Sequence, residues 1–121
     1  MRMFKVTDYV AMENPTPGVA YRPEILEAAH NAKDIGGMFG LLPAGTRVPY
    51  PYHRKRESII IVISGEATEI IEGEEIPIAA GDVLYIPAGE RHATINNSNK
   101  DFRYLEFFTC PPVAADFVEV K

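Results

Sequence analysis

The sequence predicts an all-β domain, and three observations lead to this prediction. First, about ten short segments rich in β-branched and aromatic residues are separated by turn signals roughly every eight to twelve residues. Second, ten prolines and nine glycines exceed ordinary usage and suit many turns better than long helices. Third, the 121 residues are 46% hydrophobic and 24% charged, which is typical of one soluble globular domain. Together these features favour a β-barrel or a β-sandwich.

Residues 1–36 are expected to form N-terminal strands and a loop ahead of the main barrel. A short strand is predicted at residues 4–6, before a loop at residues 14–18 that contains two prolines and a glycine. Residues 23–31 begin with a proline and carry several apolar residues. This pattern is compatible with one or two helical turns or with an irregular edge segment.

The strands of the main barrel share an apolar or β-branched centre and end near Gly or Pro. They are predicted at residues 37–42, 47–53, 58–64, 66–71, 75–78, 83–86 and 102–108, with one more starting near residue 91. Because the segment 47–53 carries two prolines, we expect it at a sheet edge. Residues 66–71 and 75–78 are expected to pair as a hairpin around Glu72 and Gly73.

The run from Gly81 to Asn96 is the most informative part of the chain. It reads Gly, five residues, Pro, one residue, Gly, two residues, His, three residues, Asn. This is the complete second motif of the cupin superfamily, which the chain therefore resembles over about residues 37–112. The resemblance implies a double-stranded β-helix, a jelly-roll-like barrel with little helix. After the turn His92, Thr94 and Asn96 share one face, since side chains alternate with period two, and we expect His92 to line the interior.

The first cupin motif is only partly present. The family pattern is Gly, five residues, His, one residue, His, three or four residues, Glu, six residues, Gly. This chain keeps the two glycines and His53, whereas Pro51 stands at the first histidine position. Counting three residues on from His53 gives Glu57, and counting six residues back from the last glycine gives Ser58. Both remain candidates for the residue that faces the interior.

A divalent transition metal follows from the resemblance. In the family, the two histidines and the glutamate of the first motif and the histidine of the second hold such an ion. Carried over to this chain, the ligands would be His53 and His92, with Glu57 as a possible third. Imidazole and carboxylate suit Fe, Mn, Ni, Cu or Zn. The alternative is a degenerate cupin that keeps two histidines but binds no metal.

Other residues are candidates for substrate binding. Arg47 would share the face of His53 if that strand ran straight, and Ser58 would lie beside the site if it faces inward. Glu106 alternates with aromatic residues on the last long strand, where a buried carboxyl group is unusual unless it is hydrogen-bonded or catalytic. The basic run at residues 54–56 fits a solvated turn better than an attractor of anionic substrates. The excess of acidic residues lies mostly at residues 66–75 and near the C-terminus, and we interpret it as solvated surface.

For function, the resemblance implies a small polar or anionic organic molecule bound at the barrel mouth. A metal-dependent enzyme of the dioxygenase, decarboxylase, isomerase or lyase type would fit, and a non-catalytic binding or sensor module is the alternative, so enzymatic activity stays open. The net charge of −5 argues against nucleic acid as a partner. No apolar run approaches the ~20 residues of a membrane helix. The single Cys110 and the lack of a visible secretory signal favour a cytoplasmic protein.

A homodimer is expected from residues 59–63, which are all β-branched and apolar. A strand between a barrel core and water should alternate apolar with polar residues, so the outward set of this strand needs a cover. In the family the cover is commonly the equivalent sheet of a second subunit, often with the N-terminal segment crossing over. The alternative is that residues 1–30 of the same chain lie over this sheet.

Overall fold

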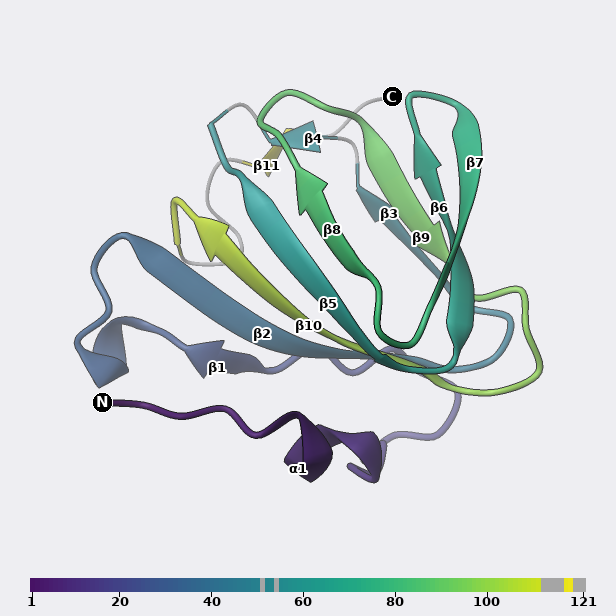
Figure 1. Cartoon of the computed structure of the whole chain (residues 1–121), viewed down its shortest axis with the longest axis horizontal. Helices are drawn as coiled ribbons and strands as arrows, with labels where there is room; N and C mark the ends of the chain where they lie inside the picture. The colour runs from purple at the N-terminus through teal and green to yellow at the C-terminus, as the bar shows by residue number, and fades with distance from the viewer. Residues whose placement is uncertain (51, 54, 112–116, 119–121) are drawn as a thin grey trace.

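The protein is a double-stranded β-helix with little helix, which confirms the predicted fold class (Figure 1). The computed structural model describes residues 1–50, 52–53, 55–111 and 117–118. The elements are α1 (Val6–Val10), β1 (Glu24–Leu26), a 3-10 turn (Ala28–His30), β2 (Ile35–Leu42), β3 (Arg47–Tyr50), β4 (Tyr52–His53), β5 (Ser58–Ser64), β6 (Glu66–Ile71), β7 (Glu74–Ala79), β8 (Val83–Ile86), β9 (His92–Ile95), β10 (Phe102–Thr109) and β11 (Phe117–Val118). In the described part of the chain, no helix has the length and apolar character needed to cross a membrane.

Two antiparallel sheets face each other and enclose the core. One has five strands in the order β1-β2-β10-β5-β8, and the other has four in the order β3-β9-β6-β7. A short pair, β4 with β11, adds to these at one end. Strand β3 is an edge strand, as expected for a segment that contains proline. Strand β10 lies between β2 and β5, so half of its side chains face the barrel interior.

The hairpin of β6 and β7 has the turn that its sequence predicts. Ile71 pairs with Glu74, which leaves Glu72 and Gly73 as a two-residue loop. Both loop residues have positive φ, 48° and 85°, the geometry that matches the twist of the flanking strands. This hairpin brings the β6 side chains across from β9, which carries the second motif.

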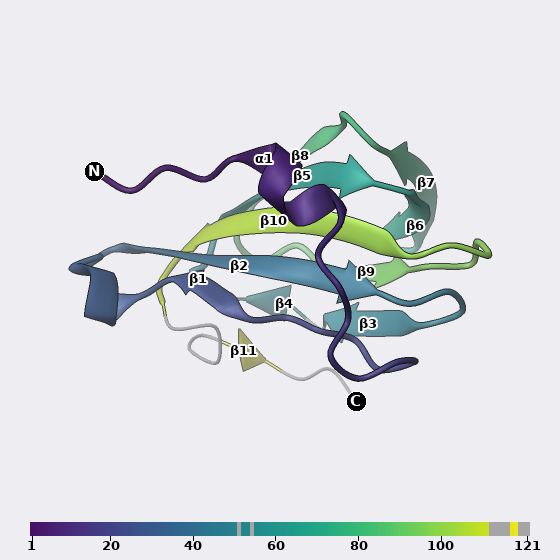
Figure 2. The same ribbon diagram turned by 90° about the horizontal axis from the view of Figure 1, so that it is seen from below.

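The strand predicted at residues 4–6 is wrong, since the chain forms the helix α1 at Val6–Val10. Figure 2 shows α1 lying over the outer face of the five-stranded sheet, above β10 and β5. There Tyr9 stacks on Phe39 with 5.4 Å between ring centroids. A segment across a sheet face cannot form hydrogen bonds with the sheet's backbone, so a helical turn satisfies its own N–H and C=O groups.

Residues 23–31 contain both expected elements, the edge strand β1 and one 3-10 turn.

The core has an inner and an outer part. The inner cluster lies between the sheets and is formed by Leu42, Val48, Ile60, Val62, Ala67, Ile78, Ile86, Phe102 and Tyr104. Gly40 makes room for Tyr104, because a Cβ at this position would lie 2.1 Å from the tyrosine ring. The outer cluster includes Ile63 and Leu105, and Tyr9 and Met12 pack against it. The N-terminal segment of the same chain therefore covers much of the outer face of this sheet.

Candidate functional site

A group of buried polar side chains lines the end of the barrel at which β5 and β9 begin and β8 and β10 end (Figure 1). Its members are all at most 5% exposed: Arg56, Ser58, Glu69, His92, Thr94 and Glu106. The opposite end is filled by apolar side chains such as Leu42 and Phe102. Burying so many polar groups costs free energy unless they are paired, so this end is the candidate functional site.

The first part of this site is a hydrogen-bonded trio on β6 and β9. Glu69 pairs in register with Thr94, which brings both side chains and that of His92 to the inner face. Oε1 of Glu69 accepts the Nδ1 hydrogen of His92 at 2.9 Å, and Oε2 accepts the Thr94 hydroxyl hydrogen at 2.6 Å. Because a carboxylate can only accept, Nδ1 of His92 carries the hydrogen in this arrangement. The trio therefore fixes the ring orientation and the tautomer of His92.

The interpretation of residues 66–75 as solvated surface is wrong for Glu69, because its side chain is only 1% exposed. Strand β6 alternates, and Ala67 and Glu69 both point inward while neighbouring acidic residues point to solvent. The sequence signal for this burial is the period-two pattern of the strand, which places Glu69 on the same face as Ala67.

Asn96, the last residue of the second motif, is buried as well. Its amide donates to the backbone oxygens of Leu42 and Lys100, so it holds the loop together.

The second part of the site is Glu106 on β10. It lies opposite Met38 of β2 and Ile60 of β5 and is 5% exposed. Burial raises the pKa of its carboxyl group, while the charge of Arg22 and a hydrogen bond with Ser58 act in the lowering direction with less effect. Oε1 of Glu106 has no hydrogen-bond partner among the described residues. Glu106 thus sits inside the barrel with one carboxyl oxygen unsatisfied by the protein.

Arg56 is a buried cation at the mouth of this end. It donates to the backbone oxygens of Thr109 and Cys110 at 3.3 Å and 3.1 Å, and its guanidinium stacks 4.4 Å from the centroid of Phe108. The solvated turn expected for residues 54–56 holds for Lys55, which is exposed, but not for Arg56. Residue 54 lies outside the described residues. Arg56 lies two and four residues before Ser58 and Ile60, on the same inward face, and this period-two pattern is the sequence signal for its burial.

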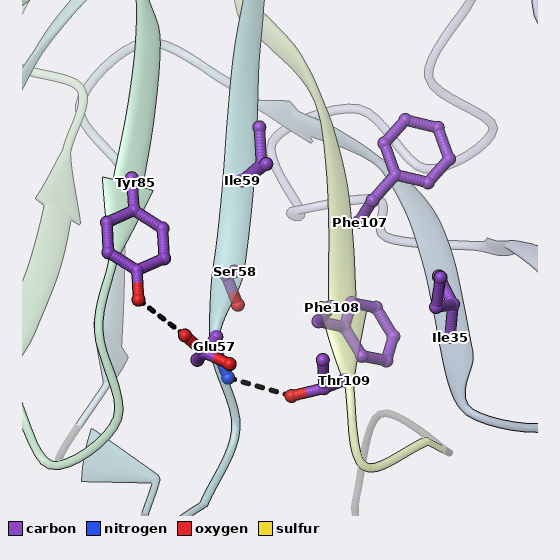
Figure 3. Close-up of a pocket in the computed structure, with 8 residues that line it drawn as sticks. All are labelled: Ile35, Glu57, Ser58, Ile59, Tyr85, Phe107, Phe108 and Thr109. Atoms are coloured by element: carbon purple, nitrogen blue, oxygen red, sulfur yellow. Dashed lines mark hydrogen bonds between the residues drawn. The ribbon is translucent and has the colours of Figure 1, made fainter.

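The two ways of counting the first motif, which gave Glu57 or Ser58 as the inward residue, can be told apart in the structure. Ser58 is buried beside Glu106, whereas Glu57 is exposed on the outer face. Figure 3 shows Glu57 accepting a hydrogen bond from the Tyr85 hydroxyl, at the rim of an outer groove of 290 Å³. The backbone N–H of Glu57 donates to Thr109. The six-residue count from the last glycine therefore gives the inward residue.

The remaining candidates lie differently from expectation or outside the described side chains. Arg47 is exposed, and its neighbour Val48 is the buried residue, because it pairs with the inward Thr94. The alternation expected at residues 47–53 thus does not hold at Arg47. The backbone of His53 pairs with Phe117 in β4 and β11, but its side chain, like all of Pro51, lies outside what the structure describes.

The described residues do not by themselves fit a metal ion. No group of three His, Cys, Asp or Glu among them is placed to hold one. Glu57 points away from the interior, a serine occupies the inward position, and Glu69 is engaged with His92 and Thr94. A metal site would need a ligand from outside the described side chains, and His53 is the one at a motif position.

Known proteins resemble this chain in sequence and in structure. A family model described as "Cupin domain" matches residues 38–108. A curated relative, the oxalate-binding protein of Thermotoga maritima, is 33% identical over 79 residues. These cover 65% of this chain and 64% of that protein, so the match spans less than two thirds of the relative's length.

Two solved structures show the same architecture. A protein with a double-stranded β-helix domain from Klebsiella pneumoniae has a TM-score of 0.77 and 25% identity, over 98% of this chain and 96% of that chain. A predicted oxalate decarboxylase from Thermotoga maritima has a TM-score of 0.68 and 29% identity, over 76% and 81% of the two chains. The barrel is therefore shared over its length.

Proposed function

Because the chain belongs to the cupin family, we propose that it binds a small polar or anionic organic molecule inside the polar end of its barrel. The observation that carries the proposal is the buried group formed by Ser58 and Glu106 on neighbouring strands of one sheet and His92 on the other sheet. An interior meant only for packing would be apolar, as it is at the other end. Polar groups that converge in a concave fold are the usual mark of a ligand site.

The charges around this site favour an anionic ligand. Arg22 and Arg56 act on Glu106 as positive charges. The negative charge of Glu69 is engaged by His92 and Thr94. A carboxylate ligand also agrees with the name of the oxalate-binding relative, although the match covers only part of that protein. We therefore propose a small mono- or dicarboxylate as the ligand class.

Titration of the protein with oxalate and malonate, followed by amide NMR shifts, tests the proposal. We expect the shifts to change at Ser58, His92 and Glu106, which lie on three different strands. Changes confined to the outer groove of Ile59 and Tyr85, or no change with either anion, would contradict interior binding.

A metal-dependent enzyme is the second candidate, and the presence of His53 and His92 at motif positions supports it. A divalent transition metal would polarise a substrate oxygen there. Elemental analysis after growth in metal-supplemented medium separates the candidates. Less than one metal per chain, unchanged in His92→Ala, would favour the non-catalytic binding protein. One metal per chain that is lost in His92→Ala would favour the metalloenzyme.

The same proposal includes a homodimer in the cytoplasm. The groove of Figure 3 is lined by Ile35, Ile59, Tyr85 and Phe107, and the first three are 52%, 46% and 58% exposed. Phe4 of the N-terminal segment packs on Phe107 at 5.3 Å between ring centroids, but Ile35, Ile59 and Tyr85 stay exposed, and a second copy of the chain is our proposed cover. The lone Cys110 cannot form an internal disulfide, which supports a reducing compartment.

A further inference from the structure

Glu106 carries an unused hydrogen-bonding capacity inside the barrel. Its side chain is 5% exposed, and Oε1 finds no partner in the described part of the chain. Buried carboxyl oxygens in proteins are nearly always hydrogen-bonded, so an orphaned one calls for an explanation. The residues that pair in register with Glu106 on the two neighbouring strands, Met38 and Ile60, are apolar and cannot supply this partner.

Charged and titratable groups face Glu106 from several elements. Arg22, ahead of β1, donates to the Met38 sulfur across from Glu106 at 3.8 Å and acts on the carboxyl group by its charge. Arg56, ahead of β5, and His92, on β9, act in the same sense. Ser58, on β5, contributes a hydrogen bond. Glu69, on β6, is engaged with His92 and Thr94.

A second anion near Glu106 requires a proton between the two carboxyl groups. Two ionised carboxylates that share a buried site repel each other, whereas a carboxylic acid donates a strong hydrogen bond to a carboxylate. The surrounding cations favour the entry of an anion and disfavour a cation. The raised pKa of Glu106 means that the proton is available closer to neutral pH than on an exposed glutamate.

We infer that Glu106 is the group that recognises the ligand, and that it does so as a carboxylic acid whose hydrogen is donated to a carboxylate oxygen of the bound molecule. This inference rests on the proposed function and narrows it to carboxylates, because a neutral amide ligand would gain nothing from the cations. This contact is a hydrogen bond: no covalent bond of the ligand forms or breaks, and the Glu106 proton is shared between the two carboxyl groups.

Proton-coupled binding has a measurable signature. Below the midpoint of the Glu106 titration the donor is already in place, and affinity is independent of this group. Above the midpoint each binding event must take up one proton, so the affinity for a carboxylate falls about tenfold per pH unit. The variant Glu106→Gln keeps a donor of the same shape but cannot titrate, and it loses this part of the pH dependence.

The experiment is calorimetric titration with malonate, and with malonamide as the neutral analogue, across a pH series. Carboxyl carbon NMR locates the Glu106 midpoint as the signal that is absent in Glu106→Gln. Paired buffers of different ionisation enthalpy count the protons. We expect wild type to take up one proton more than Glu106→Gln above the midpoint, and malonamide to bind at least about tenfold more weakly than malonate below it. The exposed Glu75→Gln is the matched control and should behave as wild type.

A second variant keeps the test independent of how well Glu106→Gln folds. Glu106→Met fills the volume without a donor, and it should weaken malonate binding about tenfold or more below the midpoint. Equal proton uptake in wild type and Glu106→Gln, or full binding by Glu106→Met, would overturn the inference while leaving the proposed function intact. If neither malonate nor oxalate binds wild type at any pH, the proposed function fails and the inference fails with it.

Discussion

Oε1 of Glu69 lies 2.9 Å from Nδ1 of His92, and both side chains are buried, at 1% and 5% exposure. The other carboxylate oxygen holds Thr94, so one buried acid organises two residues of the second motif. Neither partner would be tolerated alone in this environment, because a buried group without its partner keeps its full desolvation cost. The pair explains how a histidine can stay buried in the interior of the barrel.

The trio should behave as one energetic unit. Glu69→Gln and Thr94→Val should each lower the free energy of unfolding by about 1–3 kcal/mol, because each leaves a buried partner with a missing bond. The double variant should cost less than the sum by about 0.5–3 kcal/mol, since both changes remove the same contact. Urea denaturation of the four proteins measures this. Strictly additive costs would mean that the Glu69 and Thr94 bond contributes nothing.

The free energy of unfolding should fall as pH rises, because Glu106 ionises inside the folded protein. Its pKa in the folded protein is raised above the ordinary value of 4.5, so the folded state holds the proton longer than the unfolded chain. The stability is then complete below that ordinary value and is lost as pH rises through the folded pKa. Glu106→Gln cannot lose this proton. Its melting temperature should therefore exceed that of wild type by a margin that grows with pH above 4.5.

Thermal denaturation over a pH series checks this, with the exposed Glu75→Gln as control. A constant difference between Glu106→Gln and wild type would show that ionisation of Glu106 is not what costs stability. If Glu106→Gln is more stable than wild type but binds malonate without proton uptake, the glutamate is kept for function at a cost in stability.

Much of the barrel could be predicted from the sequence, because its signals are local. Gly and Pro mark the turns, and the β-branched run of β5 marks a strand in the interior of the five-stranded sheet. The second motif also predicts His92 on an inward face, since alternation over a few residues needs no long-range information. The helix α1 could not be predicted in the same way, because its conformation depends on the sheet face that it crosses.

The site itself was harder to predict because its acids come from strands that carry no motif. Glu69 lies among exposed acidic residues, and only the register of β6 against β9 brings it to His92. Arg47 was a candidate from the same periodicity, but in β3 its neighbour Val48 takes the inward position opposite Thr94 and leaves Arg47 exposed. Glu106 was a candidate from its aromatic neighbours, but its raised pKa depends on burial that only the closed barrel provides.

Ser58 and Glu57 should differ in their effect on Glu106. The hydrogen bond from Ser58 acts to lower the pKa of Glu106, so Ser58→Ala should move the Glu106 midpoint to higher pH. Glu57 bonds to Tyr85 outside the barrel, and Glu57→Gln should leave that midpoint unchanged. Carboxyl carbon NMR resolves the two cases. A shift caused by Glu57→Gln and not by Ser58→Ala would place the glutamate, and not the serine, at the interior site.

The outer face of β5 and β8 should form the contact of a homodimer. The N-terminal segment packs on Ile61 and Ile63, but Ile59 stays 46% exposed, as do Val83 at 65% and Tyr85 at 58%. Each aliphatic side chain of this size forgoes about 1.5–3 kcal/mol when left in water, so a few together can support a stable contact.

Light scattering at micromolar concentration should therefore give twice the chain mass of 13.4 kDa. Ile59→Lys places a charge in the centre of the contact and should return the mass to that of one chain, whereas Glu66→Lys, an exposed change on the other sheet, should not. A mass of 13.4 kDa that persists as wild type is concentrated would reject the dimer. In that case the cover of this sheet is assigned to the N-terminal segment of the same chain.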